Sequence, residues 1–479
     1  MLFQKNEKYR MLTSNQCQEI CDAVFQVLEE VGCLMKNEEA RQYMAEAGCG
    51  VSGELIKIPR EILENAIEKV PHTVTLYNRF GEPTFTLEPG ATFMGPHLGC
   101  PNTVDLETRK QRPYVEADAA NFAKVLEELP EMSWIAASGQ ISDVDPRVCD
   151  VHEARAILSN STKTVTTWAI TPESLNDIFE MCEVASGGPE ALSKRPMLFV
   201  GMCPVNGLTH GKDEIGVFLT AARRGVPLLY TPGMMSGVQT PITSAASIVM
   251  AMCDTMVGLL LSQLVNPGMP FIAAAFSDRA NMKTLALTMT NPETHLDNLC
   301  IADVFRHLGL PFCTHSTTSD ANSFDQQAAA DAAIGIYNSI LGGCNMVIHS
   351  GYLSGGMCSS LELLVYENEV LSMVRQIERG VTINDETLAV DVIKEVGPNG
   401  NYLGEEHTIE HYDELWLPQV FNRDGYMKWH DKGEPSLYDI INTKVKRIVS
   451  ANPKHPLTRE QLDKLDAIVA RAEKRVLNN

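Results

Sequence analysis

Two short stretches, PFCTHST at residues 311–317 and NMVIHSG at residues 345–351, decide the fold of this chain. Each is a run of apolar and β-branched residues that leads into a polar loop and then into a helix-like segment, which is the pattern of repeated strand and helix units. Parallel strands in such units point their C-terminal ends at one mouth. We therefore expect a common cavity there, lined by His315, Thr317, Asp320, His349, Tyr352 and Glu362.

The same pattern recurs along most of the chain. Seven β-rich runs alternate with helix-like segments and begin near residues 133, 164, 197, 226, 270, 311 and 346. This spacing suits strand and helix units of about 30 residues or more, as in an α/β TIM (β/α)8 barrel. We expect the missing eighth strand after Tyr366 or at residues 102–105. A doubly wound open sheet would show the same alternation, but no GxGxxG fingerprint follows the early strands.

The segments on either side of these repeats differ from them. Apolar residues recur at helical spacing over Thr13–Met35 and Pro59–Val70, and residues 73–106 alternate as β-hairpins do, so this section is expected to cover one end of the barrel. The tail LTREQLDKLDAIVARAEKRV predicts a charged amphipathic helix. We therefore divide the chain into an N-terminal helical and hairpin section (1–130), a barrel (131–455) and a C-terminal helix (456–479).

Composition narrows the class of protein. The chain has 479 residues, 44% of them hydrophobic, and a formal net charge of −22, which disfavours a nucleic-acid or anionic-membrane partner. No apolar run reaches the roughly 20 residues of a membrane helix, and the first residues lack the apolar core of a signal peptide, so we expect a cytoplasmic protein. The 13 cysteines are scattered without a CxxC pair. We expect reduced, buried thiols and no metal site.

Several segments resemble those of the trimethylamine methyltransferase family. They are TTSDANSFDQQAA with GGCNMVIHSGYLSGGMCSSLELLVYENE, GATFMGPHLGCPNTVDLETRKQRP near residue 90, SGVQTPITSAASIVM followed by QLVNPGMPF, and VGPNGNYLGEEHT with DELWLP near residue 400. Together they span most of the chain. The resemblance implies a TIM barrel that passes a methyl group from a methylated amine to a corrinoid protein.

One departure from the family bears on the substrate. The founding members hold a pyrrolysine in the barrel, which would align near Cys313 to His315, and this chain has ordinary residues there. It therefore resembles the branch without pyrrolysine, whose members demethylate quaternary amines such as glycine betaine. The resemblance implies a cognate corrinoid protein as methyl acceptor, with the cobalamin-type cofactor on that partner. Large barrels with helical appendages often associate, so we also expect a homo-oligomer.

Residues at the C-terminal strand ends are the candidates for a site, because barrel enzymes build their active sites there. A quaternary ammonium cannot donate a hydrogen bond or lose a proton, so its binder must use aromatic faces, each contributing roughly 2 kcal/mol when desolvated. The aromatic candidates are Trp168, Tyr230, Phe276 and Tyr352. Barrel packing is the ordinary alternative for each of them.

Polar candidates fall at the same level of the barrel. His315 and His349 occupy equivalent places on adjacent strands and are expected to hold the carboxylate of a betaine. Arg279 is the other carboxylate candidate, with a salt bridge as its alternative role. We expect Asp320 and Glu362 to orient a histidine or to offer negative charge to the ammonium, and a helix cap or an ion pair is the alternative for each. His97, in the motif GPHLG, is a second-tier candidate, as are its neighbours Gly99 and Asp105. Met202 and Asp278 are candidates by position alone.

The chain lacks the motifs of most other enzyme classes. GxSxG, HExxH and Walker A sequences are missing, and no lysine stands at the C-terminal end of an expected strand. Methyl transfer to cobalt on another protein explains this, because the chain then needs no nucleophile of its own. Two alternatives stay open: a zinc-dependent barrel methyltransferase for another methyl donor, and a betaine-binding protein without activity.

Overall fold

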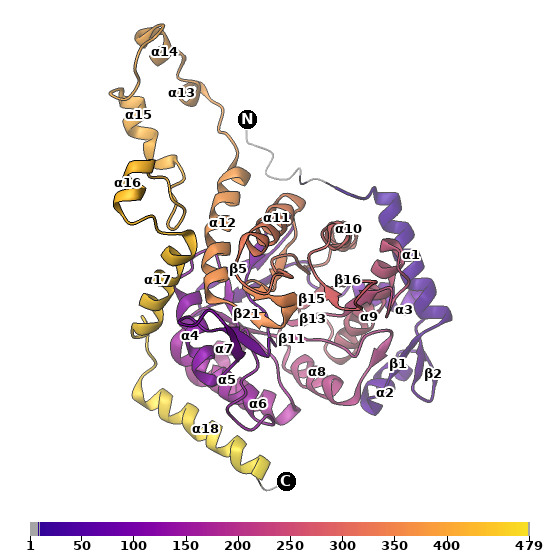
Figure 1. Cartoon of the computed structure of the whole chain (residues 1–479). Helices are drawn as coiled ribbons and strands as arrows, with labels where there is room; N and C mark the ends of the chain where they lie inside the picture. The colour runs from indigo at the N-terminus through magenta and orange to yellow at the C-terminus, as the bar shows by residue number, and fades with distance from the viewer. Residues whose placement is uncertain (1–7, 9, 478–479) are drawn as a thin grey trace.

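The computed structural model, which describes residue 8 and residues 10–477, is built around a barrel of eight parallel strands (Figure 1). Hydrogen bonds join the strands in the order β6-β19-β18-β15-β13-β11-β10-β9, and a parallel bridge between Met94 and Met132 closes the ring next to β9. In chain order the strands are β6 (Phe93–Met94), β9 (Trp134–Ile135), β10 (Thr164–Thr167), β11 (Leu198–Met202), β13 (Leu228–Tyr230), β15 (Phe271–Ala274), β18 (Phe312–His315) and β19 (Met346–Ile348).

Each barrel strand is followed by a helix of the outer layer. These helices are α4 (Glu116–Glu127), α5 (Cys149–Asn160), α6 (Pro172–Ser186), α8 (Lys212–Arg224), α9 (Ser244–Val265), α10 (Pro292–His307), α11 (Gln326–Gly342) and α12 (Leu361–Arg379), with a short α7 (Pro189–Lys194) after α6. Neighbouring strands follow one another along the chain, which is the (β/α)8 arrangement. The predicted TIM barrel is confirmed, and all seven predicted runs contain barrel strands.

The eighth strand lies elsewhere than predicted. It is β6, at Phe93–Met94 in the N-terminal section, about ten residues before the predicted 102–105. Only two residues have strand geometry here, and Gly95 and Pro96 follow at once, so the period-2 pattern is too short to read from sequence. β6 pairs with β19 and places the GPHLG segment at the mouth of the barrel.

The barrel is filled by its inward side chains. Trp134, Phe199 and Leu229 belong to an inner cluster that also includes Ile272, Ala274, Phe276, Cys313, Met346 and Ile348. The hairpin β4 (Val74–Tyr77) and β5 (Pro83–Leu87) packs on this cluster from the end where the strands begin, since Tyr77 bonds to Thr164 and Pro196. The β4–β5 hairpin therefore lies across this end of the barrel.

Two small sheets lie at the opposite end, where the strands finish. One joins β7 (Asn102–Val104) and β8 (Gln111–Pro113) to β20 (Tyr352–Leu353) and β21 (Cys358–Ser359), with a 3-10 turn at Ser354–Gly356. The other contains β14 (Gly233–Ser236), β16 (Phe276–Ala280) and β17 (Leu287–Thr288). Both begin in loops that follow barrel strands, so they shape the mouth.

The N-terminal section packs on the side of the barrel. It contains α1 (Ser14–Glu30), β1 (Cys33–Met35), α2 (Glu38–Glu46), β2 (Gly50–Ser52), β3 (Leu55–Lys57) and α3 (Arg60–Ile67). The predicted first helix ends five residues early, because Cys33–Met35 forms a strand that pairs with β3 and with β12 (Thr209–His210).

Helix α9 lies between this section and the barrel. It is long and apolar enough by composition to cross a membrane, contrary to the expectation from apolar runs, but 78% of its most apolar window is buried inside the protein. Packing against α1, α3 and the barrel sheet therefore accounts for its apolar surface.

The segment after α12 projects away from the barrel as an arm (Figure 1). It contains α13 (Asp385–Leu388), α14 (Val390–Val396), α15 (Glu406–His411), a 3-10 turn at Tyr412–Glu414 and α16 (Tyr426–Asp431), and none of these elements has a buried residue. The chain returns through α17 (Leu437–Ser450), which packs on α4 and α12, and ends in α18 (Arg459–Leu477) against α5 and α6. The predicted C-terminal helix is confirmed up to Leu477, and residues 478–479 lie outside the described residues.

Candidate functional site

The side chains at the mouth are set by the alternation of the strands that end there. On β16, Phe276 and Asp278 share one face and Ser277 and Arg279 share the other, because successive side chains of a strand point to opposite sides. Phe276 belongs to the inner cluster of the barrel. Arg279 forms an ion pair of 2.6 Å with Asp297 on the outer helix α10. Phe276 and Asp278 therefore face the mouth, and Arg279 faces the helical layer.

Five rings from four different strand ends meet at the mouth, and we call them the ring cluster: His97, Phe276, His315, His349 and Tyr352. The ring centroids of Phe276 and His315 are 4.5 Å apart, edge to face, and those of His315 and His349 are 5.3 Å apart. His349 stacks on Tyr352 at 5.0 Å and lies 5.4 Å from His97. The structure thus brings together four of the predicted residues, Phe276, His315, His349 and Tyr352, with the second-tier candidate His97 from the end of β6.

Polar atoms of the ring cluster are buried without a hydrogen-bond partner. These atoms are Nδ1 of His97, both ring nitrogens of His315 and Nδ1 of His349, whereas the Tyr352 hydroxyl lies beside the Cys100 thiol. Burial lowers the pKa of His97 to about 4 and that of His349 well below its usual range, so both rings are neutral at pH 7. A buried polar atom without a partner costs free energy unless a ligand or water satisfies it. These nitrogen atoms are therefore available to hydrogen-bond a ligand or water.

Asp278 brings a carboxylate to this cluster. Its Oδ1 lies 3.2 Å from Nε2 of His315, and both side chains are almost fully buried. The alignment is too poor for a hydrogen bond, since Oδ1 of Asp278 has no such partner. A carboxyl group in this position places an acidic side chain directly beside the ring cluster.

His349 holds an unusual backbone conformation. Its φ angle is 76°, in the left-handed region that few residues other than glycine adopt, with asparagine, aspartate and histidine the most frequent among them. The conformation ends β19, turns the chain into β20 and places the imidazole against Tyr352. Backbone strain of this kind costs about 1 to 3 kcal/mol and is concentrated at functional sites.

A pocket of about 350 Å³ adjoins the ring cluster, and we call it the mouth pocket. His97 belongs to both, and Gly201 leaves room for its ring, since an added Cβ would lie 3.1 Å from Cε1 of His97. The wall of the pocket consists of residues that follow β6, β9, β10, β11 and β13. They are His97, Leu98, Gly99, Gln140, Trp168, Ala169, Gly201, Met202, Cys203, Glu214, Val217 and Thr231.

Trp168 is held in place on the wall of the mouth pocket. Its Nε1 donates a 2.8 Å hydrogen bond to Oε2 of Glu153 on α5, and the backbone N–H of Ile141 donates to the other oxygen. Burial raises the pKa of Glu153 to about 8, so this carboxyl group is mostly neutral at pH 7. The indole is therefore fixed in one orientation with its face available to the pocket.

The structure does not bring Tyr230 and Arg279 to the mouth. Tyr230 lies between Leu229 and Thr231, which face inward, so its own side chain points outward against Phe218 of α8. Its hydroxyl hydrogen-bonds to Nδ1 of His210 at 2.7 Å. Arg279 is occupied by Asp297, Ser277 and Ser244.

Asp320, Thr317 and Glu362 also serve contacts within the fold. Asp320 accepts hydrogen bonds from the backbone and side chain of Thr290 and from the N–H of Met289, which ties two mouth loops together. Thr317 donates to the carbonyl of Ile348. Glu362 is fully buried and accepts hydrogen bonds from two residues of α17. The contacts of Asp320 and Glu362 satisfy their carboxylates away from the ring cluster.

Sequence reasoning missed two acidic residues of the site. Glu214, in the first turn of α8, reaches the mouth pocket and accepts a hydrogen bond from the N–H of Gly211. Glu153 supports Trp168 from a helix that carries no motif. Glu214 could have been found in the sequence as an acidic residue soon after a barrel strand. The role of Glu153 is visible only in the folded structure. Asp278 was a candidate from its position in the sequence alone, and the structure places its carboxyl group against the ring cluster.

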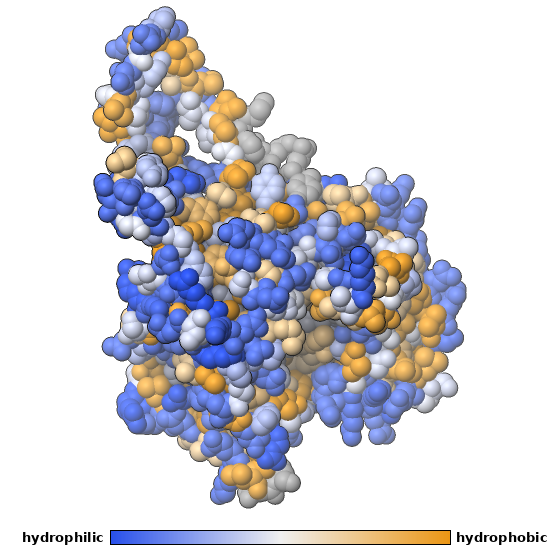
Figure 2. Space-filling view, viewed as in Figure 1, coloured by the Kyte–Doolittle hydropathy of each residue, from blue (hydrophilic) through white to orange (hydrophobic). Residues whose placement is uncertain are grey.

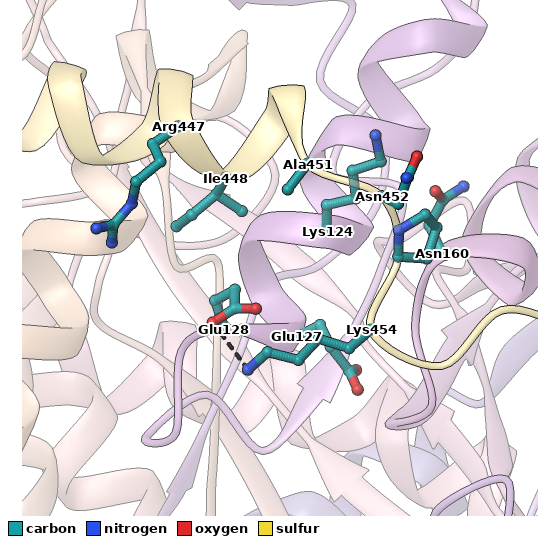
Figure 3. Close-up of a pocket in the computed structure, with 10 residues that line it drawn as sticks. Lys124, Glu127, Glu128, Asn160, Arg447, Ile448, Ala451, Asn452 and Lys454 are labelled. Atoms are coloured by element: carbon teal, nitrogen blue, oxygen red, sulfur yellow. Dashed lines mark ion pairs between the residues drawn. The ribbon is translucent and has the colours of Figure 1, made fainter.

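A second pocket, of about 310 Å³, lies at the other end of the barrel (Figure 3). Glu127 and Asn160 close α4 and α5 there, and an ion pair of 2.9 Å joins Lys454 to Glu128. The pocket collects charged side chains of the outer layer and no strand-end residue, so the mouth remains the better candidate. Over the residues that the structure describes, no group of three or more His, Cys, Asp and Glu side chains is placed to hold a metal ion.

Comparison with known proteins agrees with this architecture. The family model for trimethylamine methyltransferase (MTTB) matches residues 1–476. The chain is 26% identical to a trimethylamine methyltransferase of Desulfitobacterium hafniense over 94% of this chain and 91% of that protein. It is 25% identical to a glycine betaine methyltransferase of the same species, with 88% of each chain covered. The crystal structure of monomethylamine methyltransferase from Methanosarcina barkeri superposes with a TM-score of 0.51 at 11% identity, covering 99% of this chain and 90% of that one, which shows the shared fold. The chain therefore belongs to the trimethylamine methyltransferase family.

Proposed function

We propose that this methyltransferase removes a methyl group from a quaternary amine and passes it to the corrinoid of a partner protein. The observation that carries the proposal is the ring cluster with Asp278 against it, next to the mouth pocket that Trp168 and Glu214 line. Neither the cluster nor the lining of the pocket includes a lysine or arginine. Aromatic faces and negative charge attract a quaternary ammonium, which keeps its positive charge because its nitrogen has no proton to lose. The class includes glycine betaine, proline betaine and carnitine.

The chain's own residues hold the substrate and exclude water. Phe276, Tyr352 and Trp168 offer faces to the ammonium head, and the unpartnered imidazole nitrogens offer hydrogen bonds to its polar arm. The partner's corrinoid, when bound, supplies a cobalt(I) nucleophile whose electron pair forms the new bond to the methyl group. The carbon–nitrogen bond breaks with its electrons going to nitrogen, so a neutral tertiary amine departs. Ring faces suit this step because the positive charge declines in the transition state.

Turnover with a corrinoid partner tests the proposal. The purified chain is mixed with a reduced corrinoid protein and one quaternary amine at a time, and the visible spectrum of the corrinoid and the tertiary amine product are followed. The proposal expects methylation of the corrinoid with one equivalent of tertiary amine released. Demethylation of no quaternary amine would refute it.

The two alternatives have distinct signatures in the same experiment. Zinc at one equivalent per chain, lost together with activity toward another methyl donor, would favour the zinc-dependent methyltransferase. Tight binding of betaines without methyl loss to any corrinoid acceptor would favour a binding protein.

We also propose that the protein is cytoplasmic and forms a homo-oligomer. The arm supports association, because its apolar side chains lie in the open among polar ones (Figure 2). Leu403, Leu415 and Leu417 are 80%, 69% and 76% exposed. Exposed apolar surface on this scale is typical of a contact face. A monomer in sedimentation velocity at micromolar concentration would contradict the homo-oligomer.

A further inference from the structure

We infer that the buried part of the site takes a quaternary ammonium head with an uncharged, hydroxyl-bearing arm, and disfavours a substrate whose carboxylate lies next to the head. This rests on the proposed function and narrows its substrate class. It is argued from the charges and polar atoms that surround the ring cluster.

The charged side chains that line the mouth pocket or lie against the ring cluster are acidic. Asp278 lies against the ring cluster and Glu214 reaches the mouth pocket. The one arginine of β16, Arg279, points to the outer layer and is paired with Asp297. A carboxylate brought into the cluster would leave water and approach Asp278 without gaining a cationic partner, which is unfavourable at low dielectric.

The ammonium head meets the opposite situation. It gains the faces of Phe276 and Tyr352 and the attraction of Asp278, whose Oδ1 has no hydrogen-bond partner. Asp278 therefore selects for the cationic head. The arm of the substrate has to match the other polar groups of the ring cluster.

The other polar groups of the ring cluster are neutral and can form hydrogen bonds. Nδ1 of His97 and Nδ1 of His349 are buried and unpartnered. A hydroxyl both donates and accepts, so it can satisfy neutral imidazole groups without bringing a charge. Longer substrates such as carnitine can keep a distant carboxylate in the more open mouth pocket, whereas glycine betaine cannot, because only one carbon separates its carboxylate from the nitrogen.

Choline and glycine betaine are the matched probes, since they differ only in a CH2OH group against a carboxylate. We expect calorimetric titration of the full chain to give choline an affinity at least tenfold higher. In D278N the preference should shrink, because choline loses its countercharge and glycine betaine loses a repulsion. The control is D391N, which changes net charge equally on the exposed helix α14, and it should keep the full preference.

The outcomes separate this inference from the proposed function. Glycine betaine binding as tightly as choline to the unmodified chain would overturn the inference, and that comparison needs no variant to fold. If glycine betaine is then also demethylated with a corrinoid partner, the proposed function stands without the inference. An unchanged preference in D278N, folded by circular dichroism, would remove Asp278 from the selection. Binding of neither probe would overturn the inference as well.

Discussion

Replacing Phe276 by leucine should weaken binding of a quaternary ammonium, a loss that the same truncation elsewhere in the barrel should not cause. Phe276 lies in the inner cluster with 4% of its surface exposed, edge to face with His315 at 4.5 Å. Leucine keeps an apolar side chain there but removes the ring face. A desolvated cation and ring contact contributes about 2 kcal/mol, which is about a 30-fold loss of affinity.

A matched variant separates the ring's contact with ligand from its packing. Phe199 belongs to the same inner cluster, is fully buried and lies edge to face with Trp134, deeper in the barrel. Phenylalanine to leucine removes three carbon atoms at either position, and each buried CH2 contributes about 0.8 kcal/mol, so both variants should lose about 2 to 3 kcal/mol of stability. Only F276L should lose affinity.

Tetramethylammonium is the suitable ligand for this comparison because it carries the head group alone. Its dissociation constant is measured by calorimetry for the parent chain, F276L and F199L, and stability by urea unfolding. Equal losses of affinity in the two variants, or no loss in F276L, would refute the assignment of Phe276 to the cation site.

Three further predictions concern residues around the site. E153Q should flatten the pH dependence of stability. Because the pKa of Glu153 is about 8 in the folded state and 4.5 in the unfolded state, its contribution to stability is complete below pH 4.5 and is lost as the pH rises toward 8. An unchanged slope of the unfolding free energy from pH 5 to 8 would count against this. R279A should cost about 3 to 5 kcal/mol of stability by leaving Asp297 buried and unpaired, while the affinity for tetramethylammonium stays within twofold; a large loss of affinity in the folded variant would place Arg279 in the site after all. Y230F should remove the hydrogen bond to His210, cost about 1 to 3 kcal/mol in urea unfolding and leave ligand binding unchanged; a stable variant with weakened binding would contradict the outward placement of Tyr230.

The strands with several consecutive β-rich residues were predictable from sequence, and the exceptions have local causes. Seven runs carry a period-2 or continuously apolar pattern, and all of them contain barrel strands. β6 consists only of Phe93 and Met94, between Thr92 and Gly95, and its place in the barrel comes from pairing with β19, far along the chain. The arm was not predicted either, because its short helices bury nothing that would give a periodic pattern.

For the site, strand-end position was informative and residue type alone was not. His315, His349 and Phe276 were expected at the mouth and lie there, since each shares a face with an inward residue of its strand or follows one. Tyr230 and Arg279 have suitable side chains, but each occupies a strand position whose side chain points outward, away from the barrel interior. The phase of the alternation depends on which residues of β13 and β16 face the barrel interior, and both faces of these strands are buried. A strand with two apolar or covered faces does not show its phase in the sequence.

The most direct test of the account is a crystal structure of the chain with a bound quaternary amine. The account predicts that the nitrogen lies within about 6 Å of the ring centroid of Phe276 or Tyr352, on the side of the cluster that faces Asp278. A nitrogen bound at the opposite end of the barrel, or out of reach of every ring in the cluster, would contradict it.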